Sequence, residues 1–298
     1  MSNLEPREVI EILPVTLLEE QRQTVEALRS LAAELRLDFG WHYLLDLSWI
    51  ISRLGAVQGK RIIDAGAGTG ILQWYLAGQG AEVLSIDRGS RADLPLRFRR
   101  RYRARGLRGA PTPDLNPGSA TFRRGRFTTQ VRELAANLLS SPVAGEVVIY
   151  NQDLADLVDL PDNSVDAVVA VSALEHNPPE NLPRVVRELT RVIKPGGVLL
   201  ATLCAARDQD WYHTPSAGWC YSAASLRSSF DLPAGTPDNY ARYDEFFQAL
   251  KDCAELRDRL ARFYFKSGDN GMPWGNWDPQ YQPVGVCKIK PAAEAASP

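Results

Sequence analysis

The strongest constraint on the fold of this chain is a cluster of glycines between an apolar segment and a helical one. Residues 60–64 predict a short buried strand, the run Asp-Ala-Gly-Ala-Gly-Thr-Gly at 64–70 follows, and helical periodicity covers residues 71–77. Glycines at such a turn let the backbone approach a ligand, and the helix N-terminus offers free N–H groups. A second strand, over residues 80–87, ends in Asp87, where nucleotide-binding folds place an acid against a ribose. We therefore predict a nucleoside-shaped site at the carboxyl ends of these strands.

The rest of the chain continues this alternation of strands and helices. Near-continuous apolar runs predict strands at residues 147–150, 165–171 and 198–203, with helices at 128–140 and 183–193. Such strands, buried on both faces, are typical of a parallel sheet between two helical layers. We predict an α/β fold with a doubly wound, Rossmann-like, mostly parallel sheet that carries helices on both faces.

The additions to this core define the predicted domain organisation. Amphipathic patterns at residues 15–37 and 40–54 predict an N-terminal helical cap over residues 1–55. The core follows at 56–204, with a basic insertion at 88–127. Residues 205–291 form a substrate or lid region that completes the sheet, with a long helix at 243–263 and a last strand at 284–289, and residues 292–298 are a disordered tail.

The composition indicates the cellular environment of the protein and whether it binds a metal. The N-terminus shows no basic region followed by an apolar core, and the longest apolar runs are too short to span a bilayer. The four cysteines and three histidines are scattered without metal-ligand spacing. We therefore expect a cytoplasmic protein with no membrane contact and no metal, either a monomer or a homodimer.

The detailed spacing of the glycine turn resembles one family. One residue separates Gly68 from Gly70, and Asp64 stands two residues before Gly66. This order of an acid and three glycines resembles the class I S-adenosylmethionine-dependent methyltransferases, whereas dinucleotide-binding folds prefer two residues between the last glycines. Residues 172–176 (Ser-Ala-Leu-Glu-His) resemble a segment of the type 11, small-molecule subgroup. The resemblance covers about residues 60–204.

The resemblance implies the cofactor S-adenosyl-L-methionine, the product S-adenosyl-L-homocysteine and no metal. The glycines would hold the methionine part, Asp64 would orient the loop or the ammonium group, and Asp87 would bind the ribose. Asp153 and Leu154 would contact the adenine, and Ser172 would line the wall near the methyl group. The implied cofactor-binding residues are Asp64, Gly66, Gly68, Gly70, Asp87, Arg88, Asp153, Leu154 and Ser172.

Two histidines are candidates for a general base. His176 follows the fourth predicted strand, where the methyl group should point, and an imidazole is suited to taking a proton from a hydroxyl or amine. The alternative is a histidine that packs the loop without proton transfer. His213 is a second candidate, within an aromatic segment (Trp211, Tyr212, His213) that lines an acceptor or packs added helices.

An arginine-rich segment leaves open whether the protein acts on a nucleic acid or on a small molecule. Residues 88–132 contain thirteen arginines and two aspartates, within an otherwise acidic chain. Arginines interleaved with aromatics suit nucleic acid, yet we expect residues 88–132 to be a mobile flap that receives an anionic small-molecule acceptor. The predicted function is methyl transfer to an oxygen or nitrogen of a small molecule. An RNA or protein methyltransferase and a non-catalytic S-adenosylmethionine-binding module are the alternatives.

Overall fold

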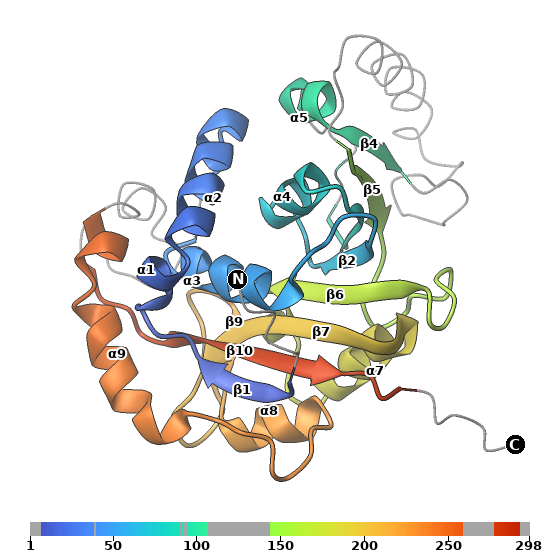
Figure 1. The fold of residues 1–298 in the computed structure, drawn as a ribbon. Helices are drawn as coiled ribbons and strands as arrows, with labels where there is room; N and C mark the ends of the chain where they lie inside the picture. Colours follow the sequence, from blue (N-terminus) through green and yellow to red (C-terminus); the bar gives the residue numbers. More distant parts are fainter. Residues whose placement is uncertain are drawn as a thin grey trace, which may run out of the picture.

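The computed structural model describes residues 7–38, 40–89, 91, 95–106, 144–258 and 277–292. Within these ranges the molecule is built on one ten-stranded sheet, in which eight strands follow the order β1-β10-β7-β6-β2-β3-β5-β4 (Figure 1). The remaining strands, β8 and β9, form an antiparallel hairpin whose second strand pairs with β7. The strands are β1 (Val9–Ile12), β2 (Arg61–Ala65), β3 (Glu82–Asp87), β4 (Arg103–Gly106), β5 (Glu146–Asn151), β6 (Val165–Val171), β7 (Ile193–Ala205), β8 (Trp211–His213), β9 (Gly218–Tyr221) and β10 (Gln282–Ile289).

The centre of the sheet is parallel. β2 pairs with β3 on one side and with β6 on the other, and β5 and β7 extend these two halves, all in the same direction. The order of the strands therefore reverses between β2 and β6. In open α/β sheets a ligand binds at such a reversal, outside the carboxyl ends of the strands.

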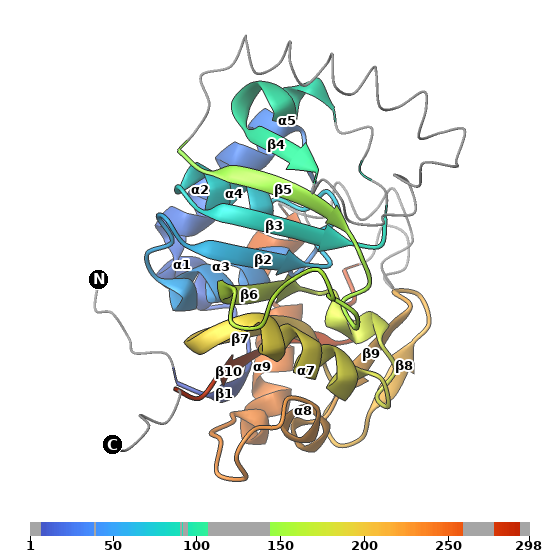
Figure 2. The same cartoon turned by 90° about the vertical axis from the view of Figure 1, so that its right-hand side faces the viewer.

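Helices cover both faces of the sheet, so the predicted doubly wound α/β fold is confirmed. Helices α1 to α5 contribute to the core on one face, and α7 and α8 pack on the other (Figure 2). The helices are α1 (Leu17–Glu20), α2 (Arg22–Leu35), α3 (Tyr43–Leu54), α4 (Leu72–Gly78), α5 (Leu96–Arg101), α7 (Leu182–Val192), α8 (Ala223–Ser229) and α9 (Tyr243–Lys251), with short 3₁₀ turns η2 (Leu174–His176) and η3 (Tyr240–Arg242).

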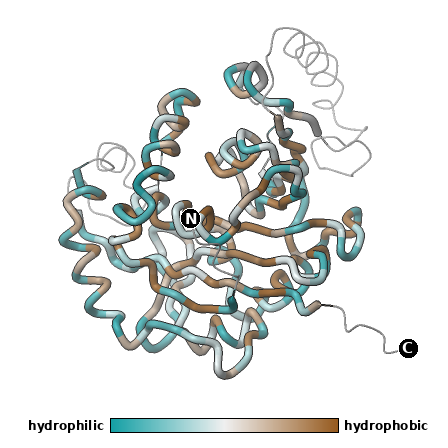
Figure 3. The backbone as a smooth tube through the Cα atoms, in the orientation of Figure 1, coloured by the Kyte–Doolittle hydropathy of each residue, from teal (hydrophilic) through white to brown (hydrophobic). Residues whose placement is uncertain are grey.

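The sequence pattern explains these layers. Strands β6 and β7 are apolar over most of their length because both of their faces are buried (Figure 3). Helix α3 lies close to the sheet at β10, where a Cβ added to Gly285 would come within 2.5 Å of the Trp49 ring. Glycine at this position therefore allows the indole to pack directly on the strand backbone.

Three predicted elements need correction. The N-terminal region is not wholly helical, because β1 joins the sheet antiparallel to β10 and the Asn239 amide binds both backbone groups of Ile12, at 2.7 and 3.0 Å. The predicted helix at 243–263 ends at Lys251, and residues 254–258 form a separate helical turn. β7 begins at Ile193 rather than at residue 198, since residues 196 and 197 bond to the Lys290 backbone beyond β10.

The first part of the arginine-rich segment is packed rather than flap-like. Phe98 and Tyr102 are each 1% exposed, and their rings lie 4.7 and 5.1 Å from the Trp74 ring. The Arg97 guanidinium donates to the Leu35 carbonyl at 2.6 Å, and Arg101 forms an ion pair with Glu34. The expected mobile flap is therefore wrong for residues 95–106. Most of the segment, residues 107–143, lies outside the described residues, as does the helix predicted at 128–140.

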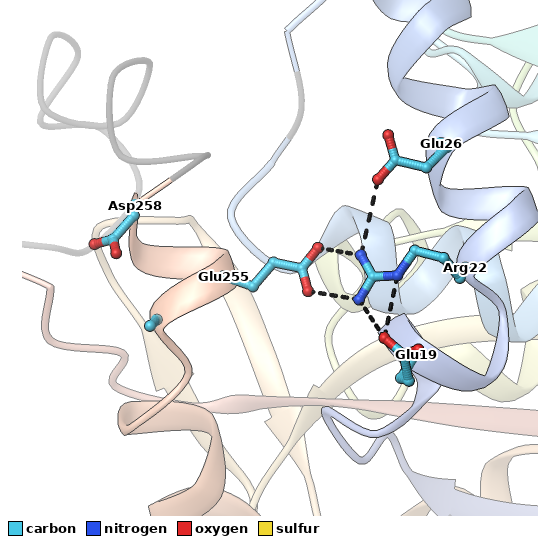
Figure 4. Close-up of a pocket in the computed structure, with 6 residues that line it drawn as sticks. Glu19, Arg22, Glu26, Glu255 and Asp258 are labelled. Carbon is cyan, nitrogen blue, oxygen red and sulfur yellow. Dashed lines mark hydrogen bonds and ion pairs between the residues drawn. The ribbon is translucent and has the colours of Figure 1, made fainter.

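An ion-pair junction connects the N-terminal helices to the turn after α9. The Arg22 guanidinium binds both oxygens of Glu255, at 2.6 and 3.0 Å, and Glu19 at 2.7 Å, beside a surface hollow (Figure 4). The residues of this ion-pair network line the hollow, and Arg22 is already paired with the glutamates around it. We therefore interpret the hollow as a packing junction and not as a binding site.

The packing of α5 leads to the first prediction. Phe98→Ala should lower the free energy of unfolding by about 3 kcal/mol, because the substitution leaves a cavity against Trp74. Arg103→Ala, at an exposed position of the adjoining strand β4, is the control and should change it little. Denaturant unfolding measures both variants, and equal stability of the two would show that α5 does not pack as described.

Candidate active site

The glycine turn forms the closest contact at the strand reversal. Gly66 has φ of +72°, and a Cβ added there would lie 2.4 Å from the Cβ of Ala173, which follows β6. The amides of Gly66 and Ala67 both donate to the Ile86 carbonyl, at 2.8 and 3.1 Å. Only glycine fits at residue 66, because it tolerates the positive φ and leaves room for the backbone after β6.

Asp87 lies directly beside this turn, as predicted. Its Oδ2 accepts a hydrogen bond from the Gly68 amide at 2.9 Å, and its Oδ1 accepts one from Gly89 at 2.6 Å. Each carboxylate oxygen has a second lone pair. The carboxylate is therefore fixed in place and keeps acceptor capacity for the hydroxyls of a ligand.

A buried polar network supports the turn from below. The Gln73 side-chain amide donates to the carbonyls of Gly70, Ala67 and Gly68, at 2.9, 3.3 and 3.3 Å, and its oxygen accepts from Ser85 at 2.6 Å. The Arg91 guanidinium donates to Ser85 at 2.5 Å and to the Tyr150 carbonyl at 3.0 Å. Gln73 and Arg91 were not predicted as site residues. The position of a glutamine among apolar residues at the start of α4 could have indicated a buried polar contact at Gln73.

Asp64 is buried under the turn, with 3% of its surface exposed. Burial raises the pKa of its carboxyl to about 7, against the lowering effects of Arg91 and the Gln73 backbone amide, and Asp87 adds a further raising effect. The carboxyl thus changes charge near neutral pH, within reach of a cation placed at the turn. Its predicted role toward the ammonium group stays a prediction.

The remaining cofactor candidates lie along the same edge of the sheet. Arg88 and Asp153 form an ion pair at 2.6 Å across the ends of β3 and β5, and Leu154 is packed beside them against the apolar core. Ser172 ends β6 with φ of +47°, and its hydroxyl donates to Glu175 Oε1 at 2.5 Å. The structure therefore brings the predicted residues to one edge, while their contacts with a cofactor stay predictions.

The two candidate bases differ in their surroundings. His176 is exposed, and its Nδ1 lies 3.0 Å from the Ala217 carbonyl, which can only accept, so that Nε2 is left without a proton. His213 is 5% exposed, and its Nδ1 accepts from the Ser216 amide at 3.4 Å. The same Nδ1 lies 2.7 Å from the Ser216 hydroxyl, which can donate or accept, so His213 is held by Ser216 in this loop. Burial also lowers the pKa of His213.

The aromatic segments lie where a substrate region was expected. The β8–β9 hairpin joins the carboxyl end of β7 through pairing of Cys204 with Cys220, and Trp211 and Tyr212 are 37% and 47% exposed. Trp277 packs edge-on against Trp41, with ring centres 5.9 Å apart. Trp274 lies outside the described residues.

The structure also brings together four polar side chains that were not predicted to form a cluster. His42, Asp46, Glu175 and Tyr281 are all buried at this edge of the sheet, with at most 4% of their surface exposed. They come from the start of α3, from η2 and from the residue before β10. The four-residue spacing of His42 and Asp46 was visible in the sequence, but the other two partners are distant in it.

No three metal-ligand side chains come together anywhere in the part of the chain that the structure describes. Likewise, among the described helices none is long and apolar enough to cross a membrane.

Comparisons with known proteins agree with this architecture. Residues 109–201 match a family model described as a methyltransferase domain; the match begins in the arginine-rich segment and ends in β7. A ubiquinone biosynthesis O-methyltransferase of Leptothrix cholodnii is 26% identical over 240 residues, 76% of this chain and 81% of that protein. An enzyme of the same name from Acinetobacter baumannii is 49% identical over 45 residues. This aligned stretch covers 15% of this chain and 19% of that relative.

A solved structure, that of the 4+2 cyclase SpnF, is also similar, with a TM-score of 0.49 at 18% identity over 96% of this chain and 100% of SpnF. The match to the methyltransferase domain and the similarity to the Leptothrix enzyme confirm the resemblance found in the sequence. Residues 109–201 of this chain are therefore similar to a methyltransferase domain.

The tight approach at Gly66 gives a second prediction. Gly66→Ala should lower the melting temperature and weaken binding of S-adenosylhomocysteine at least tenfold, because the new Cβ meets both a disfavoured φ and Ala173. Gly78→Ala is the matched control, since nothing lies within 4 Å of an added Cβ at this position of α4. Thermal unfolding and calorimetric titration decide the matter, and a Gly66→Ala protein that behaves like Gly78→Ala would contradict the described contact.

The raised pKa of Asp64 gives a third prediction. The carboxyl has its ordinary pKa of 3.8 in the unfolded chain and about 7 in the fold. Between these values the folded protein holds a proton that the unfolded chain has lost, so this group makes stability fall as pH rises from about 4 to 7. Asp64→Asn removes this dependence. We expect its melting temperature, relative to the wild type, to be several degrees higher at about pH 8 than at about pH 4. A difference independent of pH would refute the burial of an ionisable Asp64.

Proposed function

We propose that the protein is an S-adenosylmethionine-dependent methyltransferase that acts on an oxygen or nitrogen of a small molecule. The observation that carries the proposal is the position of the Gly66–Gly68–Gly70 turn at the strand reversal, with Asp87 held against the Gly68 amide. Ligands of doubly wound folds bind at this place, and a carboxylate at the end of the second strand suits a ribose.

The names of the relatives favour oxygen as the acceptor atom. Both are O-methyltransferases of ubiquinone biosynthesis. The Leptothrix enzyme is 26% identical to this chain over 81% of the enzyme's length. We therefore propose the same class of reaction, methyl transfer, for this chain and leave the acceptor to be identified by experiment.

The residues of the site fit this cofactor. A Cβ added to Gly68 would have only the Asp87 Oδ2 within 4 Å, at 3.9 Å, so the backbone at Gly68 has space beside it for a ligand. Bound S-adenosylmethionine supplies a methyl group on a positively charged sulfur. In the proposed mechanism, Asp87 binds the ribose, Asp153 and Leu154 contact the adenine, and Asp64 faces the ammonium group. Ser172 lines the wall beside the acceptor, so the chain acts mainly by positioning and by excluding water.

Two arginines of the arginine-rich segment are engaged within the chain itself. Arg97 and Arg101 bind the Leu35 carbonyl and Glu34 of the chain's own α2. Phosphate contacts would need these guanidinium groups to be available, which is why we propose a small molecule instead.

The fourth prediction tests the cofactor. Calorimetric titration should detect binding of S-adenosylmethionine and S-adenosylhomocysteine but not of NAD. Asp87→Ala should weaken this binding by about 1.5–3 kcal/mol, the range for hydrogen bonds to a charged group. Asp252→Ala, at an exposed aspartate after α9, is the control and should bind normally. Binding of NAD alone would overturn the proposed function, and an unchanged affinity in Asp87→Ala would place the ribose elsewhere.

A further inference from the structure

A buried histidine–aspartate pair stands at the beginning of α3. His42 Nδ1 lies 2.6 Å from Asp46 Oδ2, and the two residues are 3% and 0% exposed. Asp46 Oδ1 is also buried and receives no hydrogen bond from any residue that the structure describes. Burying such a pair costs desolvation free energy that well-packed apolar side chains would avoid, so a purely structural role explains it poorly.

The pair fixes the tautomer of the imidazole. An ionised carboxylate can only accept, so beside ionised Asp46 a neutral His42 donates through Nδ1, and its Nε2 is the acceptor nitrogen. The Tyr281 hydroxyl lies 3.4 Å from this nitrogen. This is the arrangement in which an imidazole, oriented by a carboxylate, takes a proton through Nε2.

The pair lies on the acceptor side of the candidate site. Tyr281 precedes β10, whose Gln282 pairs with Ala205 at the carboxyl end of β7. Burial raises the pKa of Tyr43, next to His42, and the charges of Glu175 and Asp46 raise it further. The charges of Glu175 and Asp46 thus both act on the Tyr43 side chain, and Glu175 is joined to Ser172 by the 2.5 Å hydrogen bond.

Glu175 adds a second unpartnered group. Its side chain is 3% exposed, and its Oε2 is buried without a hydrogen-bond partner among the described residues. Burial raises the pKa of Glu175. A buried polar oxygen without a partner is costly, which a hydrogen bond from a ligand would relieve.

Aromatic rings surround the pair. The Trp41 ring lies 4.6 Å from that of His42 and 5.2 Å from that of Tyr281, and the His213 ring lies 5.1 Å from Tyr281. Edge-on and tilted rings of this kind give a stiff apolar wall that suits a planar ring with a few polar substituents.

We propose that His42, oriented by Asp46, is the general base that deprotonates a phenolic acceptor, and that Glu175 binds a second polar substituent of the same ring. The inference deepens the proposed function and rests on it. The acceptor O–H proton passes to His42 Nε2 while the acceptor oxygen bonds to the methyl carbon. The carbon–sulfur bond breaks with its electron pair left on sulfur, and the proton on His42 is later released to water.

The first test needs no ligand. The chain has three histidines, His42, His176 and His213, so nitrogen NMR of histidine-labelled protein, assigned with single variants, reports each tautomer separately. Wherever the spectrum shows a neutral imidazole, His42 should carry its proton on Nδ1. Asp46→Asn should shift this tautomer toward Nε2–H. A proton on Nε2 of His42 in the wild type would overturn the proposal, whatever cofactor the protein binds.

The second test follows the proton. With S-adenosylhomocysteine bound, the probe 4-nitrocatechol should show more phenolate absorbance than the free probe at the same pH, because the imidazole takes its proton. His42→Gln should bind S-adenosylhomocysteine within about twofold of the wild type but lose this ionisation and about 100-fold in turnover of 4-nitrocatechol, as for loss of a general base. Glu175→Gln should keep the ionisation and bind the probe more weakly.

The outcomes separate the two proposals. Loss of ionisation in His176→Gln, with His42→Gln unaffected, would assign the base to the exposed histidine and overturn the inference. Failure of the wild type to bind the probe would overturn the phenol assignment. Failure to bind S-adenosylhomocysteine would instead count against the proposed function, while the tautomer of His42 would still be measured independently.

Discussion

The contact between Gly66 and Ala173 determines the geometry of this edge of the sheet. β2 and β6 are neighbouring parallel strands. After β2 the chain leads to β3 on one side, whereas after β6 it leads to β7 on the other side, so the segments that leave their carboxyl ends would otherwise diverge. At Gly66 they approach so closely that an added Cβ would lie 2.4 Å from that of Ala173. As a result the glycine turn and the turn that carries Ser172 and Glu175 share one wall.

The turn is held by polar groups that the apolar core would normally exclude. Asp64, Gln73, Ser85 and Arg91 are at most 6% exposed, and Gln73 supplies the donors that three loop carbonyls require. A buried network of this kind is stable only when its members are paired, and pairing restricts it to one arrangement. The network therefore gives the loop a fixed shape before any ligand arrives, which reduces the entropy lost on binding.

The sequence predicted those parts of the molecule that depend on local pattern. The strand, glycine turn and helix over residues 61–78 and the position of Asp87 follow from apolar runs and glycine spacing, and the structure contains them. Pairing between distant segments was not predictable in this way. β1 lies within the residues that were assigned to a helical cap from the patterns at 15–37 and 40–54, and its pairing with β10 joins residues almost 280 apart. Phe98 and Tyr102 were read as parts of a mobile segment because their arginine neighbours obscured an apolar stripe that packs on Trp74.

The same distinction separates the two halves of the candidate site. The half assigned to the cofactor is built mainly from residues 64–91, so its chemistry is visible as a motif. The acceptor half combines His42, Glu175 and Tyr281 from three separate segments, and the contact between His42 and Tyr281 spans 239 residues. Gly66 with Ala173 and Ser172 with Glu175 are two contacts that join these halves. A cofactor can therefore be inferred from sequence in such a fold, whereas the acceptor depends on side chains that only the folded chain brings together.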